Sequence, residues 1–483
     1  MRLGLVGSAL FTIFAGFFGL SAVAYALGGL LEDLGREKLQ MSGLGNLSAI
    51  LIVMLVIVMV TATLLTLAER KWPSYMQDRV GPNRARFSII PGLKNRALGG
   101  IPHIVTDVLK MLTKEAFRPK AANAFLFNLG PMLAFAPVFA LFAVVPAGPT
   151  LKVFDNPVKM VAIDVDFGLL YLFAIASLAV YGTSLAGWSS NNKFALLGGI
   201  RASSQMISYE VALGLSLVGM MIAFSTVRLA GPTGMSEMQM QYLWSTKMWG
   251  VDVGLPAWGI FLQPLGFLLF FAAGFAETKR APFDAPEGES EIVGYFLEYS
   301  GMQFGMFMIS EFVEVVLFAG VLVAVFFGGW ALPFGNDAIL GSAFAQAHPI
   351  VIGGFFGLVF WVKVLILIYI QLAVRWTMTR FRYDQIQTLG WKILLPLGIA
   401  NVFVSGALIL LDPSLRYLAL FGTLITGSTL FLTLTPPRQV RLAQEEADAH
   451  GGHGHGGHGH DDHGHGHDDH APSQAPSLPA GHH

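Results

Sequence analysis

The chain has 483 residues, of which 54% are hydrophobic and 13% are charged, and its formal net charge is -1. This hydrophobic fraction is larger than a soluble domain needs to fill its core. The net charge near zero argues against nucleic acid as a partner. The absence of cysteine excludes a thiolate-ligated iron-sulfur cluster, a disulfide and a thiol nucleophile in this chain. We therefore expect an all-α polytopic membrane protein, because lipid leaves a spanning backbone little alternative to helix.

Apolar runs separated by charged loops predict about ten transmembrane helices. The clearest run, SAILIVMLVIVMVTATLLTLA, lacks the polar face that a soluble core helix would show. The predicted spans are 5–30, 48–68, 124–146, 167–188, 204–227, 257–276, 299–328, 349–374, 390–411 and 417–434.

The first span has two interpretations. Arg2 followed by an apolar stretch and the small-residue pattern Ala22-Val23-Ala24 is also typical of a secretory signal. We prefer a retained helix. Both interpretations place residues 32–46 outside the cytoplasm.

Basic residues indicate the orientation of the spans. The loop after the second span is rich in them and is therefore expected to be cytoplasmic. Its basic residues are Arg70, Lys71, Arg79, Arg84, Arg86, Lys94 and Arg96. Alternate loops place Lys193, Arg201, Lys279, Arg280, Arg375, Arg380 and Arg382 on the same side. The segment 330–348, on the opposite side, contains no lysine or arginine.

Two further segments have a distinct character. Ile101, Val105, Val108 and Leu112 recur at helical spacing, which predicts an amphipathic helix that lies either in the membrane interface or on the protein's own cytoplasmic surface. The tail from 438 to 483 holds eleven of the thirteen histidines among Gly and Asp, and we expect it to be disordered with incidental metal affinity.

Ionisable residues inside apolar runs are candidates for chemistry, because a charged carboxylate in hydrocarbon costs at least about 2.5 kcal/mol. Glu210 lies near the start of one span, and Glu311 and Glu314 share a face of another by their i, i+3 spacing. Lys363, in the middle of a later span, is a candidate counter-charge for them. The alternative is that these groups form closed ion pairs that only hold helices in register.

Four charged segments are far more specific than the composition. They are ERKWPSYMQDRVGPNR (69–84), GWSSNNKFALLGGIRASSQMISYE (187–210), AETKRAPFDAPEGESEIVGYFLEYSG (276–301) and RWTMTRFRYDQ (375–385). Together they resemble the core membrane subunit of respiratory NADH:quinone oxidoreductase (complex I), called the H subunit in bacteria and the first mitochondrially encoded subunit in animals. The resemblance spans about 48–411.

This resemblance implies a fold and a function. The fold would be an eight-helix core (48–411), with an extra N-terminal helix and periplasmic linker (1–47), an extra C-terminal helix (412–437) and the tail (438–483). The core would form, with two peripheral subunits, the chamber in which ubiquinone or menaquinone is reduced. A relay of buried carboxylates would couple quinone reduction to proton translocation.

The resemblance also implies roles for individual residues. The proton relay would use Glu210, Glu277, Glu298 and Glu311. The quinone site would use Arg70, Gln77, Arg79, Arg280, Asp284, Glu287, Glu289 and Glu291. No metal site is predicted.

The remaining implications concern partners. FMN, NADH and the iron-sulfur clusters would belong to partner subunits, so that this chain would not be catalytic alone. The partners would be peripheral-arm subunits, small and antiporter-like membrane-arm subunits, and lipid, in a bacterial inner membrane with the charged motif loops in the cytoplasm.

Several features depart from the family pattern. About ten residues are inserted near 87–99, and His103-Ile104 stands where the family usually has Gln-Pro. The stretch between Glu291 and Glu298 is one residue shorter than usual, which would rotate Glu298 by about 100° in a helix. Thr379-Arg380 replaces the usual Pro-Arg.

Three alternatives remain at this point. The membrane subunit of an energy-converting hydrogenase or ferredoxin-linked oxidoreductase shares the fold and part of the carboxylate pattern. A free-standing ion or solute transporter would use buried acids as substrate sites, although the sequence shows no internal repeat. A metal-buffering protein would use the histidine tail but would leave the charged loops unexplained.

Overall fold

A computed structural model describes residues 2–39, 44–86, 98–154, 156–248, 251–288, 292 and 294–434. Met1–Gly427 form one compact unit, and Ser428–His483 form a second. The histidine-rich tail, most of the insertion near 87–99 and two predicted quinone-site residues, Glu289 and Glu291, lie outside the described residues.

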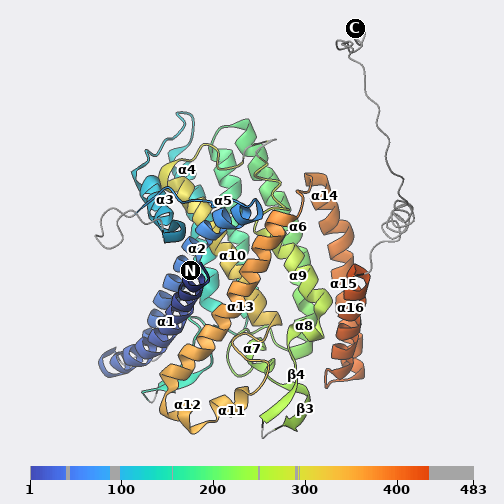
Figure 1. The fold of residues 1–483 in the computed structure, drawn as a ribbon. Coiled ribbons are helices and arrows are strands. Elements are labelled where there is room, and N and C mark those ends of the chain that lie inside the picture. Colours follow the sequence, from blue (N-terminus) through green and yellow to red (C-terminus); the bar gives the residue numbers. More distant parts are fainter. Residues whose placement is uncertain are drawn as a thin grey trace, which may run out of the picture. The chain divides into compact units, whose positions relative to one another are not determined.

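The described part of the chain is almost entirely helical (Figure 1). The α-helices are α1 (Arg2–Leu39), α2 (Leu44–Met76), α3 (Ile101–Thr113), α4 (Ala124–Leu141), α5 (Gly168–Ser189), α6 (Lys193–Phe224), α7 (Met235–Met238), α8 (Gly259–Leu262), α9 (Pro264–Glu277), α10 (Gly301–Phe326), α11 (Asn336–Leu340), α12 (Ala343–Ala347), α13 (Pro349–Thr377), α14 (Tyr383–Thr388), α15 (Leu395–Leu411) and α16 (Arg416–Leu434). Short 3-10 turns lie at Leu98–Gly100 and Phe142–Val144, and a π-helical turn at Leu389–Leu394 joins α14 to α15.

The ten predicted spans each coincide with a helix or helix pair, and the prediction of an all-α polytopic membrane protein is confirmed. Eight helices in the described part are long and apolar enough to cross a membrane. The predicted span 257–276 divides into α8 and α9, and α9 has only 14 residues, about 21 Å of helix. The predicted span 417–434 coincides with α16.

Two small antiparallel hairpins were not predicted. β1 (Leu151–Val153) pairs with β2 (Asn156–Val158), and β3 (Tyr242–Met248) pairs with β4 (Val251–Pro256). Both hairpins belong to connections between helices, and these connections were interpreted only by their charged residues.

Helix α10 lies at the centre of the helix packing, in contact with α2, α4, α9 and α13. Every residue from Val315 to Phe326 is buried. A helix that is apolar on all sides is expected in such a position, because none of its faces gains from contact with water. Glu311 and Glu314 lie on the polar half of this helix, nearer Gly301.

Helix α1 packs along α2 and α13 (Figure 1). The ring of Phe17 stacks on Trp361 of α13 at 5.5 Å, and the buried Tyr25 hydroxyl donates to the carbonyl of Pro149 at 2.6 Å. Gly353 and Gly357 of α13 leave room for Tyr25 and Ser21. Close packing over small residues is a common basis of helix association in lipid.

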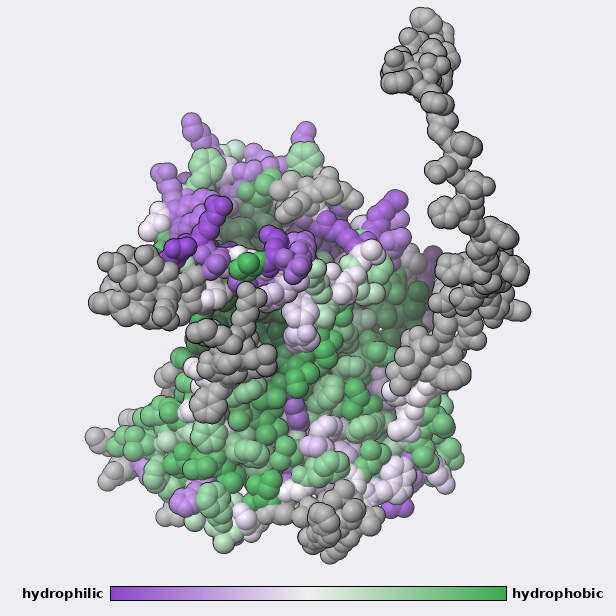
Figure 2. Space-filling view, in the orientation of Figure 1, coloured by the Kyte–Doolittle hydropathy of each residue, from purple (hydrophilic) through white to green (hydrophobic). Residues whose placement is uncertain are grey.

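Hydrophilic side chains gather at the end of the first unit where α3 and α14 lie, whereas the flanks of the helices are hydrophobic (Figure 2). Helix α3 confirms the predicted amphipathic helix. Its apolar residues Ile101, Val105, Val108 and Leu112 are between 45% and 60% exposed, whereas Ile104 on the same face is less exposed. This exposure favours the membrane-interface interpretation.

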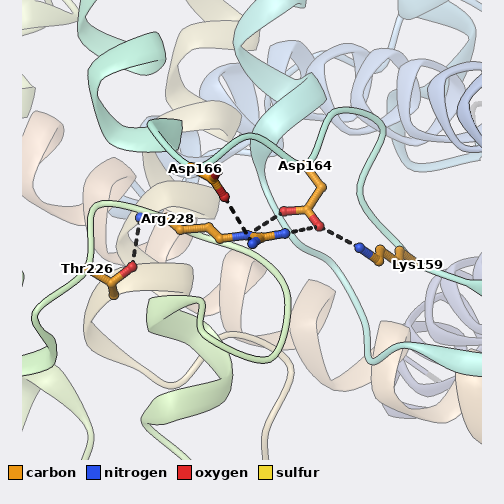
Figure 3. Close-up of polar contacts among 5 residues, drawn as sticks. All are labelled: Lys159, Asp164, Asp166, Thr226 and Arg228. Carbon is orange, nitrogen blue, oxygen red and sulfur yellow. Dashed lines mark hydrogen bonds and ion pairs between the residues drawn. The ribbon is translucent and has the colours of Figure 1, made fainter.

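The connections at the opposite end are held by a charged cluster (Figure 3). Arg228, after α6, donates from Nη2 to Asp164 at 2.6 Å and from Nη1 to Asp166 at 3.1 Å. Lys159 contacts the same carboxylate of Asp164 at 2.7 Å. The cluster therefore ties the α4–α5 connection to the α6–α7 connection.

Candidate functional site

The segment 278–300, between α9 and α10, brings together most of the predicted acidic residues. Glu287 lies against Glu311 of α10, and their carboxyl groups are hydrogen-bonded. Burial and the neighbouring charge of Glu311 raise the pKa of Glu287 well above its usual range. The Tyr295 hydroxyl lies 3.4 Å from Glu311 Oε1 and donates to it. This pair can hold a proton at a place where carboxylates otherwise repel each other.

A buried lysine occupies the next position along this group of acids. Lys279 is 3% exposed, and its Nζ lies 3.6 Å from Glu314 Oε2. Burial alone would lower the pKa of Lys279, but the charges of Glu314, Glu311 and Glu277 outweigh burial and raise it. The counter-charge of the α10 acids is therefore Lys279, and the expectation that Lys363 serves this role is wrong.

Lys363 instead binds the chain beyond the far end of α10. Its Nζ donates to the carbonyls of Phe327 at 2.8 Å, Gly329 at 3.0 Å and Ala331 at 2.5 Å, and it lies 4.5 Å from the ring centroid of Trp258. All three ammonium hydrogens thus have acceptors. A cation at a helix C-terminus also compensates the free carbonyls there.

Glu210, Glu277 and Glu314 line a cavity of about 110 Å³ between α4, α5, α6, α9 and α10. Most other lining residues are apolar, among them Leu213 and Phe318. Glu277 Oε2 is buried and has no hydrogen-bond partner among the described residues. Glu277 also interacts electrostatically with Glu210, Glu314 and Lys279. Acids of three helices therefore line one cavity.

Asp284 connects the same segment to the chain after α13. It forms an ion pair with Arg380, and the backbone N–H of Phe381 donates to the carbonyl of Pro282 at 3.1 Å. Burial raises the pKa of Asp284, and the charge of Arg380 offsets part of this effect. Asp284 Oδ1 is buried without a partner in the described part of the chain, and so remains open to a hydrogen-bond donor.

Arg280 is held in a partly buried ion triad. Glu69, near the C-terminal end of α2, accepts from Arg280 and also from Arg375 Nη1 at 2.7 Å. The Arg280 guanidinium lies 4.7 Å from the ring centroid of Phe312, and the residue is 7% exposed. The triad joins three segments of the chain, and Arg280 Nε is buried without a hydrogen-bond partner among the described residues.

The remaining predicted quinone-site residues with a described structure lie at the surface around the end of α2. Arg70 forms an ion pair with Asp107 of α3 at 2.7 Å, and its side chain is 48% exposed. Arg79 Nε donates to Gln77 Oε1 at 2.7 Å, and both residues are exposed. These three residues are therefore grouped near α3, apart from the buried acids.

Glu298 lies away from the other predicted relay acids. Its Oε1 accepts from Asn192 Nδ2 at 2.7 Å, and the two residues line an open hollow of about 310 Å³ with Pro119 and Lys193. Asn192 is also the N-cap of α6 and accepts from the backbone N–H of Phe194. The relay role of Glu298 remains a prediction from sequence.

Comparison with known proteins identifies the family. A family model described as NADH dehydrogenase matches residues 48–406. The H subunit of NADH-quinone oxidoreductase from Flavobacterium psychrophilum is 38% identical over 365 residues, which cover 75% of this chain and 97% of that protein. The same subunit from Flavobacterium johnsoniae is 38% identical, with coverage of 75% and 95%, and one from Cytophaga hutchinsonii is 39% identical, with coverage of 73% and 93%.

The chain belongs to the H subunit family of NADH-quinone oxidoreductases. Residues 48–406, which the family model matches, contain every described residue of the candidate site. Helices α1 and α16 lie outside that match, at either end of this member of the H subunit family.

The sequence analysis missed several residues of the site in this H subunit relative. Glu69 and Arg375 complete the partly buried ion triad, Tyr295 donates to Glu311, and Gln205 bonds the end of α9. Glu69 and Arg375 lie in charged segments of the sequence. Those segments were interpreted mainly as indicators of the orientation of the helices in the membrane. Gln205 and Tyr295 carry no charge, so only their placement inside the motif segments could have drawn attention to them.

Proposed function

We propose that this chain is the membrane subunit of a proton-pumping NADH:quinone oxidoreductase that forms the wall of the quinone chamber and carries the carboxylate relay. The observation that carries the proposal is the succession of partly buried acids from Glu287 through Glu311 and Glu314 to Glu277 and Glu210. Burying so many acids is costly, and they are more concentrated than a helix-registering ion pair requires.

The quinone end of the proposed path is the cytoplasmic side of segment 278–300. Its wall would comprise Arg70, Gln77, Arg79, Arg280, Asp284, Glu287, Glu289 and Glu291. The unpartnered Asp284 Oδ1 and Glu287 Oε1 are buried groups able to interact with a quinone headgroup or with the protons consumed in its reduction. The ion triad around Glu69 would keep Arg280 beside the chamber, with the Glu69 carboxylate offsetting one of its two positive charges.

The proposed relay uses Glu311, Glu277 and Glu210, with Glu298 as a fourth member from the sequence. A unit negative charge on reduced quinone about 10 Å away, at an effective dielectric of about 20, changes the balance of a carboxyl group by about 1.7 kcal/mol. This corresponds to slightly more than one pKa unit. Such a change alters the protonation of one carboxyl group. Several carboxyl groups in series are therefore needed to transfer protons over a longer distance.

The electrons would come from neighbours. Under this proposal quinone is the substrate, while NADH, FMN and the iron-sulfur clusters belong to peripheral-arm subunits, and the chain is not catalytic alone. Small and antiporter-like subunits would continue the membrane arm. The membrane would be the bacterial inner membrane, with the charged end of the molecule in Figure 2 facing the cytoplasm.

The proposed division of the chain follows the helices. Residues 48–411 would be the quinone-chamber and relay core, 1–47 and 412–437 would contribute extra helices for packing or assembly, and 438–483 would be the tail. The packing of α1 on α2 and α13 supports a structural role for the first of these segments.

The decisive experiment is extraction of the protein with its native neighbours in mild detergent, followed by mass spectrometry and an inhibitor-sensitive NADH:quinone reductase assay. We expect cluster-bearing and antiporter-like subunits in the same fraction as the activity. Co-purification with a nickel hydrogenase, or a stable fraction without either partner or activity, would overturn the proposal. Reconstitution into liposomes then tests whether quinone reduction drives proton uptake.

A further inference from the structure

A buried glutamine links the proposed quinone segment to the proposed relay. Gln205 of α6 is 0% exposed. Its Nε2 donates to the carbonyl of Ala276 at 2.7 Å and to the carbonyl of Phe283 at 2.7 Å. Ala276 directly precedes Glu277, and Phe283 directly precedes Asp284. One amide group therefore holds the backbone beside a relay acid and the backbone beside a quinone-site acid.

The helix turn around Gln205 also binds the other side of the site. The Tyr209 hydroxyl donates to the carbonyl of Ile386 at 2.8 Å, and the Tyr383 hydroxyl donates to Ser204 Oγ at 2.9 Å. These bonds fix α14, which follows directly after Arg380, the ion-pair partner of Asp284. The α6 turn 204–209 is thus the common support of both segments that meet at Asp284.

The side-chain oxygen of Gln205 differs from the nitrogen in its hydrogen bonding. Gln205 Oε1 is buried and accepts no hydrogen bond from the described residues. A glutamine that served packing alone would be expected to have both ends satisfied, because an unpaired buried acceptor costs free energy. This acceptor is available to a proton-bearing group in the same space.

We propose that Gln205 is the positioning residue that couples movement of segment 278–300 at the quinone chamber to the relay carboxylates of α6 and α9. This inference rests on the proposed function and deepens it. Because both hydrogens of one planar amide are engaged, a displacement of the Phe283 carbonyl must either move the Ala276 carbonyl or break a bond. Charge and position at Asp284 and Glu277 are therefore linked through the backbone, in addition to any electrostatic effect.

The test compares Gln205→Met with Gln263→Met in the intact complex. Gln263 is also a buried glutamine, next to the other end of α9, and its Nε2 donates to Ser405 Oγ at 2.6 Å. Both variants lose buried hydrogen bonds, but only Gln205 contacts the site. The measurements are the KM for a short-chain quinone, kcat, the ratio of protons moved to electrons transferred in proteoliposomes, and the thermal unfolding midpoint.

We expect Gln205→Met to raise the KM by about tenfold, as loss of two buried hydrogen bonds would allow, and to lower the proton-to-electron ratio. Gln263→Met should lower the unfolding midpoint while leaving KM and the ratio at wild-type values. If Gln205→Met prevents assembly, Gln205→Glu serves, since it keeps the shape but has no donor while ionised. Wild-type KM and ratio in the assembled Gln205 variant, or equal effects of the two sites, would overturn the inference.

The wild-type complex separates this inference from the proposed function. If the wild type does not couple quinone reduction to proton movement, the proposed function fails, and the role of Gln205 fails with it. If the wild type is coupled and only the Gln205 result is negative, the proposed function stands and the positioning role is rejected.

Discussion

Glu287 shows how a neighbouring carboxyl group, that of Glu311, changes the pKa of a glutamate. Their carboxyl groups are hydrogen-bonded, so the pair is most stable when it shares a proton. Tyr295 also donates to Glu311. Burial and the neighbouring charge of Glu311 raise the pKa of Glu287 well above its usual range.

The first prediction concerns the pH dependence of this pair. Because burial and the neighbouring Glu311 raise the pKa of Glu287, this residue keeps its proton to a higher pH than an ordinary glutamate and loses it as the pH rises further. If that proton is required, kcat for quinone reduction falls at alkaline pH. Glu287→Gln cannot ionise, so its pH profile should lack this alkaline limb and its proton-to-electron ratio should fall.

The control for this measurement is Glu115→Gln, which neutralises an exposed carboxylate before α4. It should reproduce the wild-type profile. An alkaline limb that persists unchanged in Glu287→Gln would show that another group titrates there.

At the scale of elements, hydropathy predicted where helices lie but not how they extend or what they touch. The predicted span 204–227 is part of α6, which begins at Lys193, because a helix can continue from lipid into the polar loop region. Lys363 and Arg280 were visible as charges in the sequence. Their acceptors lie 32 to 36 and 211 residues away along the chain, and no periodicity reports contacts between segments so far apart.

The same limit applied to the candidate site. Glu210, Glu277 and Glu311 were predicted from their segments, and the structure brings them to one group of acids. The described residues between Glu291 and Glu298 form turns rather than a helix, so the rotation expected from the shorter spacing does not apply to them. The uncharged Gln205 gave no comparable signal, because its importance depends on two carbonyls that face it only in the folded chain.

The second prediction tests the connection that Lys363 makes between elements. Lys363→Met leaves three carbonyls beyond α10 without their donor, and should lower the free energy of unfolding by at least about 3 kcal/mol. Lys392→Met, at an exposed position before α15, should change it by less than about 0.5 kcal/mol. Thermal unfolding in detergent measures both. Equal midpoints for the two variants would show that the Lys363 bonds do not hold α10 in place.

At the scale of the whole molecule, the two ends of the helices are stabilised differently. The end that carries segment 278–300 concentrates acids in a few segments, whereas the other end uses the cluster of Arg228, Lys159 and Asp164 in Figure 3. Burial alone would raise the pKa of Asp164, but the hydrogen bonds from Arg228 and Lys159 outweigh burial and lower it. This cluster therefore contributes stability while Asp164 is ionised.

The third prediction follows from that sign. An acid with a lowered pKa in the folded state stabilises the protein above its unfolded pKa, about 3.9, and this stability is lost as the pH falls through the folded pKa. Arg228→Met should therefore lower the free energy of unfolding by about 1–3 kcal/mol at pH 7. Its difference from wild type should shrink as the pH falls below about 3.9 and through the lowered pKa of Asp164. Arg382→Met, which removes an exposed pair with Asp384, should have little effect at either pH, and a pH-independent Arg228 effect would contradict the assignment.

The last prediction asks whether α1 is part of the mature molecule, although it lies outside the family match at 48–406. A Cβ at Gly353 would overlap the ring of Tyr25, whereas one at Gly406 in α15 would meet nothing within 4 Å. With α1 in place, Gly353→Ala should lower the free energy of unfolding by about 1–3 kcal/mol, and Gly406→Ala should be neutral or stabilising by less than about 1 kcal/mol. If the chain were cleaved after Ala24 as a secretory signal, Tyr25 would be the free N-terminal residue without the helix that holds its ring against α13, and Gly353→Ala would be as well tolerated as Gly406→Ala. Thermal unfolding of the two alanine variants thus decides between a retained helix and a cleaved one by a packing contact, independently of any assay of quinone reduction.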